Sequence, residues 1–367
     1  MVDRGLALNR QAWILTSCPM QRRRKLSASN VLGVALILLL IGLSFRGADL
    51  DAIGRSLANL GPLRVAVLLS LQPLAWCAET YGWRSVFVIL GPQVRFSSLL
   101  GIRIGTEAIT IAAPAGALVA DSLRIPLLMR GLDISAAHAL AGTCARKYAL
   151  LVSQSCYTLF AAWLGFEALR IASSELLNGS RQLPWAVVAA GALIALGAIV
   201  LRALLSRGNA ALGVRAALSK LRFERVQKFL RESERVFADT DGALVRFFAQ
   251  PRAEFAIHFW FWLGWLIEGI ETWLVLRCLG ANVTLAEALA MDAAVVFLRN
   301  VIVIVPAGLG IQDAGYALFL RALGVPAAVE LAAALALLKR GKELLWVLLG
   351  LWLLSARPYE PRAATQP

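Results

Sequence analysis

The stretch that decides the fold is residues 285–325, LAEALAMDAAVVFLRNVIVIVPAGLGIQDAGYALFLRALGV. It is strongly apolar, but Pro306, Gly308 and Gly310 interrupt it, and charged side chains such as Arg299 lie within it. Proline removes a backbone donor, and an ionisable side chain is expensive in hydrocarbon. We therefore predict a broken or re-entrant helix enclosed by protein, the setting in which irregular backbone is tolerated at membrane depth.

An earlier stretch, residues 98–131, has the same character and reads SLLGIRIGTEAITIAAPAGALVADSLRIPLLMRG. Pro114 and Gly116 interrupt it, and Glu107 stands where the later stretch has Arg299. Both stretches contain Pro-Ala-Gly followed by an aspartate. We predict a second broken segment here.

The offset between the two stretches is constant. Pro114 and Pro306 are 306 − 114 = 192 residues apart, and Asp121 and Asp313 are 313 − 121 = 192 apart. The same offset relates two further pairs, Glu79 with Glu271 and Lys147 with Lys339. Identity is otherwise low, so the repeat rests on the motif and on the shared order of elements. We predict an ancient duplication.

The composition of the whole chain is that of a polytopic membrane protein. Of 367 residues, 59% are hydrophobic and only 16% are charged, and the mean hydropathy is +0.69. Soluble domains carry nearer a quarter charged residues. Since about 20 apolar helical residues cross the hydrocarbon core, we predict an all-α transmembrane helical bundle of about six full spans plus two broken or re-entrant segments. The six expected spans are 31–45, 65–90, 148–166, 184–205, 255–279 and 327–354.

Composition also divides the chain into five parts. The central part is a basic amphipathic linker, which we expect to lie on the membrane surface or to be a solvated connecting helix. The predicted parts are a disordered basic N-terminus (1–28), a first membrane half (29–205, repeat core 65–166), the linker (206–254), a second membrane half (255–355) and a polar tail (356–367).

Basic residues indicate the orientation. Arg22 to Lys25 precede the first span, and residues 202–252 hold the other basic cluster. The positive-inside rule places both in the cytoplasm, so we expect both termini on the cytoplasmic side of a bacterial inner membrane. The first broken segment must then re-enter without crossing. The second copy starts from the opposite side, which predicts inverted repeats, as in transporters whose substrate sites lie near the midplane.

Several function classes lack support in the sequence. The net charge of +14 lies in clusters that flank spans, so nucleic-acid binding is not expected. Five scattered cysteines form no CxxC pair and the two histidines no HExxH motif, so no metal site or disulfide framework is expected. There is no catalytic triad and no phosphate loop. We predict no cofactor and no enzymatic activity.

The segments RIGTEAITIAAPAGALVADSLRIPLLMRG, RNVIVIVPAGLGIQDAGYALFLRALG and LLKRGKELL resemble a known family. It is the lysylphosphatidylglycerol-synthase transmembrane-region family, also called flippase-like, and the likeness over about residues 30–355 is closest to its hopanoid-biosynthesis-associated branch. Family members carry a glycine-rich turn where this chain has residues 117–120, ALVA. The resemblance implies movement of a lipid or lipid-linked molecule across the membrane, and in that branch delivery of hopanoids towards the outer membrane.

Ionisable residues at membrane depth are functional candidates, because they are expensive there. Cations and helix N-termini suit a phosphate, and carboxylates suit an amine. The substrate-path candidates are Glu79, Glu107, Asp121, Lys147, Glu271, Arg299, Asp313 and Arg340, and the broken-helix turns are Pro114, Gly116, Pro306, Gly308 and Gly310.

Each group of candidates has a structural alternative. Asp121 and Asp313 are placed to cap the helices that restart after the turns. Glu107 and Arg299 are placed to pair across the repeat axis. Lys342 near a span end is expected to extend to the interface. Glu79 and Glu271 lie deep in long spans, and we favour them most as functional residues.

Three functions compete at this point. A lipid flippase requires that Glu79, Asp121, Glu271 and Asp313 converge on one polar cavity, and its partners are anionic phospholipids or a hopanoid. A lipid-modifying transferase is disfavoured, since the synthases carry a soluble catalytic domain that is not expected after residue 354. A non-catalytic scaffold that binds lipid-biosynthesis enzymes would tolerate alanine at all four carboxylates.

Overall fold

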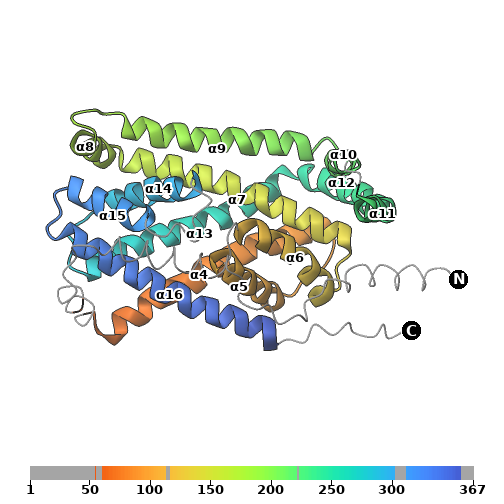
Figure 1. Cartoon of the computed structure of the whole chain (residues 1–367), viewed down its shortest axis with the longest axis horizontal. Helices are drawn as coiled ribbons and strands as arrows, with labels where there is room; N and C mark the ends of the chain where they lie inside the picture. Colours follow the sequence, from red (N-terminus) through yellow and green to blue (C-terminus); the bar gives the residue numbers. More distant parts are fainter. Residues whose placement is uncertain (1–53, 55–59, 113–115, 221–222, 302–310, 357–367) are drawn as a thin grey trace, which may run out of the picture. The chain divides into compact units, whose positions relative to one another are not determined.

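A computed structural model describes residue 54 and residues 60–112, 116–220, 223–301 and 311–356. All of these belong to one compact unit, residues 44–367. They form thirteen helices, and no strand occurs among them. The predicted all-α bundle is confirmed (Figure 1).

Eight of the helices form two sets of four, at corresponding places in the sequence. The first helix set is α4 (Gly61–Leu90), α5 (Phe96–Ala112), α6 (Gly116–Leu132) and α7 (Ala136–Leu164). The second helix set is α13 (Pro251–Cys278), α14 (Leu285–Val301), α15 (Ile311–Ala322) and α16 (Ala328–Ala356). Helices α7 and α16 begin 328 − 136 = 192 residues apart and end 356 − 164 = 192 apart, the offset of the sequence repeat.

Local sequence explains where the long helices begin and end. Pro62 occupies the first turn of α4, where a missing backbone N–H costs nothing. Gly91, with φ 106°, ends that helix in a backbone conformation that glycine adopts without strain. The Ser135 side chain accepts a hydrogen bond from the His138 N–H at the start of α7.

The two interrupted stretches fold into helical hairpins. In the first, Arg124 on α6 donates to Thr106 on α5, and Gly116 lies so close to Thr110 that an added Cβ would be 2.2 Å from its carbonyl oxygen. Later residues of α6 thus lie beside earlier residues of α5. The two helices therefore run antiparallel, and the chain reverses between them. The turn containing Pro114 lies outside the described residues.

The second interrupted stretch reverses in the same way. Tyr316 on α15 lies 3.2 Å from Asp292 on α14, and Gly315 packs against Val295. Residues 302–310, and with them Pro306, Gly308 and Gly310, lie outside the described part of the chain.

At the centre, α4 and α13 pack side by side in antiparallel directions. Three contacts establish this, Gly82 with Phe261, Glu79 with Gly264 and Gln72 with Glu268. One helix of each hairpin also packs on the other helix set. Helix α5 packs on α16, where a Cβ at Gly350 would lie 2.7 Å from the Ile104 carbonyl oxygen, and α14 packs on α7.

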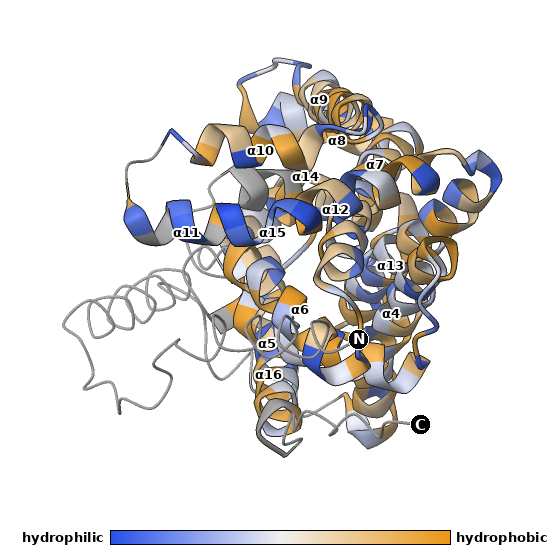
Figure 2. Cartoon of the chain, turned by 90° about the vertical axis from the view of Figure 1, so that its right-hand side faces the viewer, coloured by the Kyte–Doolittle hydropathy of each residue, from blue (hydrophilic) through white to orange (hydrophobic). Residues whose placement is uncertain are grey.

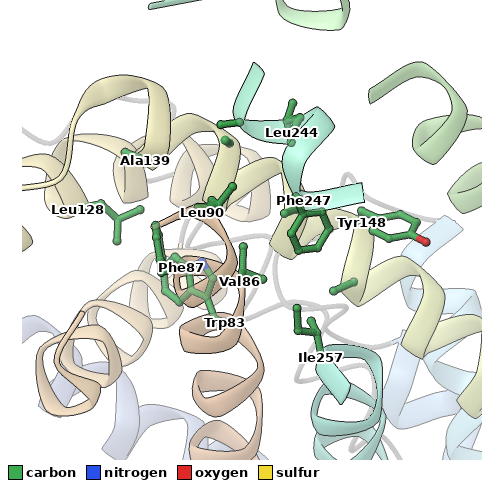
Figure 3. Close-up of a cluster of buried hydrophobic side chains, with 14 of the residues drawn as sticks. Trp83, Val86, Phe87, Leu90, Leu128, Ala139, Tyr148, Leu244, Phe247 and Ile257 are labelled. Atoms are coloured by element: carbon green, nitrogen blue, oxygen red, sulfur yellow. The ribbon is translucent and has the colours of Figure 1, made fainter. Parts of the chain in front are cut away.

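The core lies mainly where α4, α7, α12 and α13 meet. Trp83 and Phe87 of α4 pack with Phe247 of α12 and Ile257 of α13 (Figure 3). A second apolar cluster joins α13, α14 and α15 around Tyr316. These clusters fix the long helices on which the charged side chains are mounted.

Three helices are long and apolar enough to cross a membrane: α4, α13 and α9 (Leu183–Leu205). A fourth is obtained if α7 counts together with α8 (Phe166–Leu176), which bends away by 78° after Gly165. Helix α16 is also long, but four charged residues lie close together in it, within 339–343. The expected span 31–45 lies outside the described residues, as do 1–28 and 357–367.

The linker is three helices, α10 (Ala210–Leu218), α11 (Glu224–Glu232) and α12 (Glu234–Phe248), at one end of α9 (Figure 1). Leu244 and Phe247 of α12 are buried against the protein core. The apolar face of α12 is covered by α7. The expected placement of the linker at the membrane surface stays a prediction. Figure 2 shows polar residues concentrated on α11 and α12.

Candidate functional site

A network of charged side chains is buried within the first helix set. Its members, called the first network, are Glu79, Arg103, Thr106, Glu107, Asp121, Arg124, Arg146 and Lys147. They come from all four helices of the set, so the network exists only when the first hairpin is folded against α4 and α7.

Glu79 of α4 is the deepest carboxylate of the first network. Arg103 of α5 approaches it with two nitrogens, Nη2 at 2.8 Å and Nε at 3.0 Å, and also pairs with Glu107 one turn along α5. Arg146 of α7 approaches Glu79 from another side at 3.6 Å. The two arginines stack on tryptophans of α4, Trp76 and Trp83 respectively, which shield them from water.

Asp121 of α6 lies among three cations. Its Oδ1 contacts Arg124 on the same helix and lies 3.9 Å from Arg146 Nη1, and its Oδ2 accepts from Lys147 Nζ at 3.2 Å. The arginine side chains are about 5% exposed, Asp121 20% and Lys147 45%. The network therefore runs from a buried interior at Glu79 to an exposed edge at Lys147.

Cations outnumber carboxylates in the first network. Four cationic side chains face three carboxylates, and the Nε of Arg146 has no hydrogen-bond partner among the described residues. A buried, unpaired guanidinium nitrogen costs free energy unless a further acceptor satisfies it.

A second network lies within the second helix set. Its members are Tyr157, Glu271, Thr272, Asp292, Gln312, Asp313, Tyr316, Lys339, Arg340, Lys342 and Glu343. Tyr157 belongs to α7 and so reaches this network from the first helix set.

Asp292 is the centre of the second network. Tyr157 donates to its Oδ2 at 3.0 Å, and Thr272 and Tyr316 lie 3.1 and 3.2 Å from its Oδ1. Lys339 Nζ is 3.6 Å from the same carboxylate and donates to Thr272 and Tyr316 at 2.8 and 2.9 Å. This carboxylate is fully surrounded by donors, and the lysine is neutralised within the protein.

The predicted carboxylates are divided between the networks. Glu79 and Asp121 share Arg146 in the first, whereas Glu271 pairs with Lys342 at 2.5 Å and Asp313 lies 3.6 Å from Arg340 in the second. The contacts thus link the carboxylates pairwise, one pair within each helix set, and the convergence of all four on one cavity stays a prediction.

Two of the structural alternatives from the sequence can now be judged. Asp121 is not in the first turn of α6, so the capping interpretation was wrong for it, whereas Asp313 does lie in the first turn of α15. Lys342 does not extend to an interface, because it is buried against Glu271. Glu107 pairs with Arg103 of its own helix, and the Arg299 side chain lies outside the described residues.

Sequence reasoning missed several members of the networks, among them three ionisable residues and two tyrosines. Arg124, Arg146 and Asp292 are ionisable residues in apolar surroundings, so the depth argument used for Glu79 would have found them. Tyr157 and Tyr316 carried no such signal, because tyrosine in an apolar helix is ordinary. Gly116 opens α6, and residues 117–120 that replace the family's glycines are helical.

A further buried ion pair lies outside both networks. Glu254 of α13 binds Arg202 of α9 at 2.9 Å, and the Tyr148 hydroxyl lies 3.4 Å from the same carboxylate. It joins α9 to the bundle. Among the described residues, no group of three or more His, Cys, Asp or Glu side chains is arranged to hold a metal ion.

Long apolar helices around buried charge networks define a polytopic membrane protein whose interior, not its lipid-facing surface, carries its polar chemistry. The model of the family "Lysylphosphatidylglycerol synthase TM region" matches residues 30–351, and the chain belongs to this family of integral membrane proteins of lipid metabolism and transport. No curated protein and no solved structure matches the chain.

Proposed function

We propose that the protein moves a lipid or lipid-linked molecule across the bacterial inner membrane, without catalysing a covalent change. The observation that carries this is the first network, where charged side chains lead from the half-exposed Lys147 to the buried Glu79. In a membrane such side chains are costly, and they mark paths for polar groups. A lipid headgroup needs such a path, because bare hydrocarbon would strip its water without replacement.

The arrangement of the helix sets supports the same proposal. Two corresponding helices, α4 and α13, pack antiparallel, as expected for an inverted duplication with both termini in the cytoplasm. In transporters of this kind the substrate site lies between repeats near the midplane, and broken helices contribute to it. Here the two hairpins are the broken elements.

We propose the substrate as a class of lipid. Phospholipids and hopanoids are the two candidates that follow from the family. The first network provides both cations and carboxylates for a headgroup. A scaffold for lipid-biosynthesis enzymes would not require an ionic path from an exposed edge to the interior.

The test is leaflet exchange in vesicles that contain the purified chain. Fluorescent lipids, including a hopanoid derivative, are reconstituted with the protein, and the fraction accessible to an added reductant is followed. We expect exchange above that of empty vesicles. Absence of exchange for every lipid would remove the transport proposal and leave the scaffold.

A double variant tests the role of the networks. Glu79→Gln with Glu271→Gln removes the negative partner of Arg103 and that of Lys342, and we expect exchange to fall by about tenfold or more. The matched control, Glu167→Gln with Glu175→Gln, removes two exposed carboxylates of α8 and should retain the rate. Retained exchange in the first variant would contradict the assigned path.

A further inference from the structure

Asp121 lies in front of cations that are more deeply buried than itself. Arg124 and Arg146 are about 5% exposed, while Asp121 is 20% exposed and lies next to the half-exposed Lys147. The carboxylate therefore separates the buried guanidinium groups from the open edge of the first network.

Arg146 is the least satisfied of these cations. Its distances to Glu79 and Asp121 are 3.6 and 3.9 Å, well beyond the 2.7–2.9 Å of a strong charged hydrogen bond. Its Nε has no partner among the described residues, although the side chain is buried. Both features indicate that N–H groups of the Arg146 guanidinium inside the network lack a strong acceptor.

We propose that Arg124, Arg146 and Lys147 bind a phosphate group, and that the Asp121 carboxylate is an internal counter-ion which the phosphate displaces. Guanidinium groups match phosphate oxygens in planar pairs, and the lysine adds a mobile positive charge at the entrance. The phosphate diester of a lipid matches the two anionic oxygens of a carboxylate and adds two weakly accepting ester oxygens, so it can satisfy the Arg146 Nε in addition to the contacts of Asp121. This inference rests on the proposed function, because it names the chemical group of the substrate.

The second network is not a second copy of this site. Asp292 is surrounded by donors from Tyr157, Thr272, Tyr316 and Lys339, and it is 3% exposed. Lys339 corresponds to Lys147 by the 192-residue offset, but it is only 14% exposed and has three protein oxygens within 3.6 Å. The phosphate site therefore belongs to the first helix set.

Binding is tested on the full chain in a mild detergent. Native mass spectrometry measures the affinity for phosphatidylglycerol and, as a neutral comparison, for diacylglycerol. A thermal-shift titration measures the response to inorganic phosphate. Wild-type protein should retain phosphatidylglycerol in preference to diacylglycerol. A response to inorganic phosphate as well assigns the site to phosphate itself, and its absence assigns it to a lipid headgroup.

Two variants should change the affinity in opposite directions. Asp121→Asn removes the competing charge and should raise phosphatidylglycerol affinity by about tenfold, the effect of one charged contact. Lys147→Gln should lower it by about tenfold, and because Lys147 is half-exposed the protein should stay folded. The control Glu167→Gln removes one exposed charge and should do neither.

Unchanged affinity in both folded variants would overturn the phosphate site. That outcome is distinct from failure of the proposed function. Normal leaflet exchange with no effect of either variant leaves transport standing without this site. Phosphate binding with the expected opposite shifts, but without leaflet exchange, leaves the site standing and removes transport.

Discussion

The Tyr157 hydroxyl of α7 donates to the Asp292 carboxylate of α14 at 3.0 Å, across the boundary between the two helix sets. Tyr157 and Asp292 are 1% and 3% exposed, so no water replaces this bond if it is lost. Together with the packing of α5 on α16, it makes each helix set depend on the other for its polar interior.

Tyr157→Phe should reduce the stability of the folded protein. The variant removes one donor from Asp292 and leaves the ring packing on Trp265 intact. We expect a loss of about 1 kcal/mol, typical of a single hydrogen bond inside a membrane protein. Denaturant unfolding in detergent micelles, followed by circular dichroism, measures it. Tyr81→Phe, on a half-exposed ring, is the control, and an equal loss there would contradict the assignment.

The corresponding lysines should differ in their effect on stability. Lys339→Met leaves Asp292 buried without its cation, which costs about 3–5 kcal/mol for a buried pair. Lys147→Met removes a half-exposed cation and should cost less than about 1 kcal/mol. The same unfolding measurement compares them. Equal losses would show that the two networks are equivalent, against the asymmetry described above.

Gly165 should tolerate no larger residue. A Cβ at this position would lie 2.4 Å from that of Ala290 and 2.5 Å from the Ala286 carbonyl oxygen, so α14 would have to move away from the bend between α7 and α8. Gly165→Ala should cost about 1–3 kcal/mol. Gly197→Ala has open space around it and should be neutral or stabilising. Thermal melting of the two variants in detergent separates these outcomes.

Asp241 should control the first turn of α10. Its carboxylate oxygens accept hydrogen bonds from the Ala211 and Leu212 N–H groups at 2.8 and 3.0 Å, and Asn209 makes no side-chain cap. Asp241→Ala should cost about 1–2 kcal/mol and speed amide exchange in residues 210–218. Hydrogen-exchange mass spectrometry detects this. The exposed Asp239→Ala serves as the control, and faster exchange there too would argue against a capping role.

Sequence was sufficient for the class of protein and for the two broken segments. Apolar composition required a membrane, and the Pro-Ala-Gly triplets at 114–116 and 306–308 indicated interruptions, because proline lacks an N–H and glycine disfavours a helix interior. Proline alone was not sufficient, since Pro73 and Pro126 lie inside α4 and α6. The depth of Glu79 and Glu271 was also predictable, since both lie in the middle of long helices and both prove to be buried.

The ion-pair partner of each buried charge was not predictable from the sequence, because it depends on which helices pack against each other. Lys147 and Lys339 are at matching positions, yet one binds Asp121 and the other approaches Asp292. The difference arises from α14, which supplies an aspartate where α5 has Leu100 at the corresponding position, 292 − 192 = 100. A hydrophobic pattern such as that of α12 likewise reveals an apolar face, but not whether protein or lipid covers it.

The packing of α5 on α16 sets an order on biosynthesis. Helix α5 carries Arg103 and Glu107, and its packing partner α16 is the last of the described helices to leave the ribosome. The early helices must therefore wait in the translocon or the bilayer with the surface of α5 around Ile104 and Ala108 still uncovered. Two fragments divided between α10 and α11 should then be recovered as a folded complex only when they are produced together.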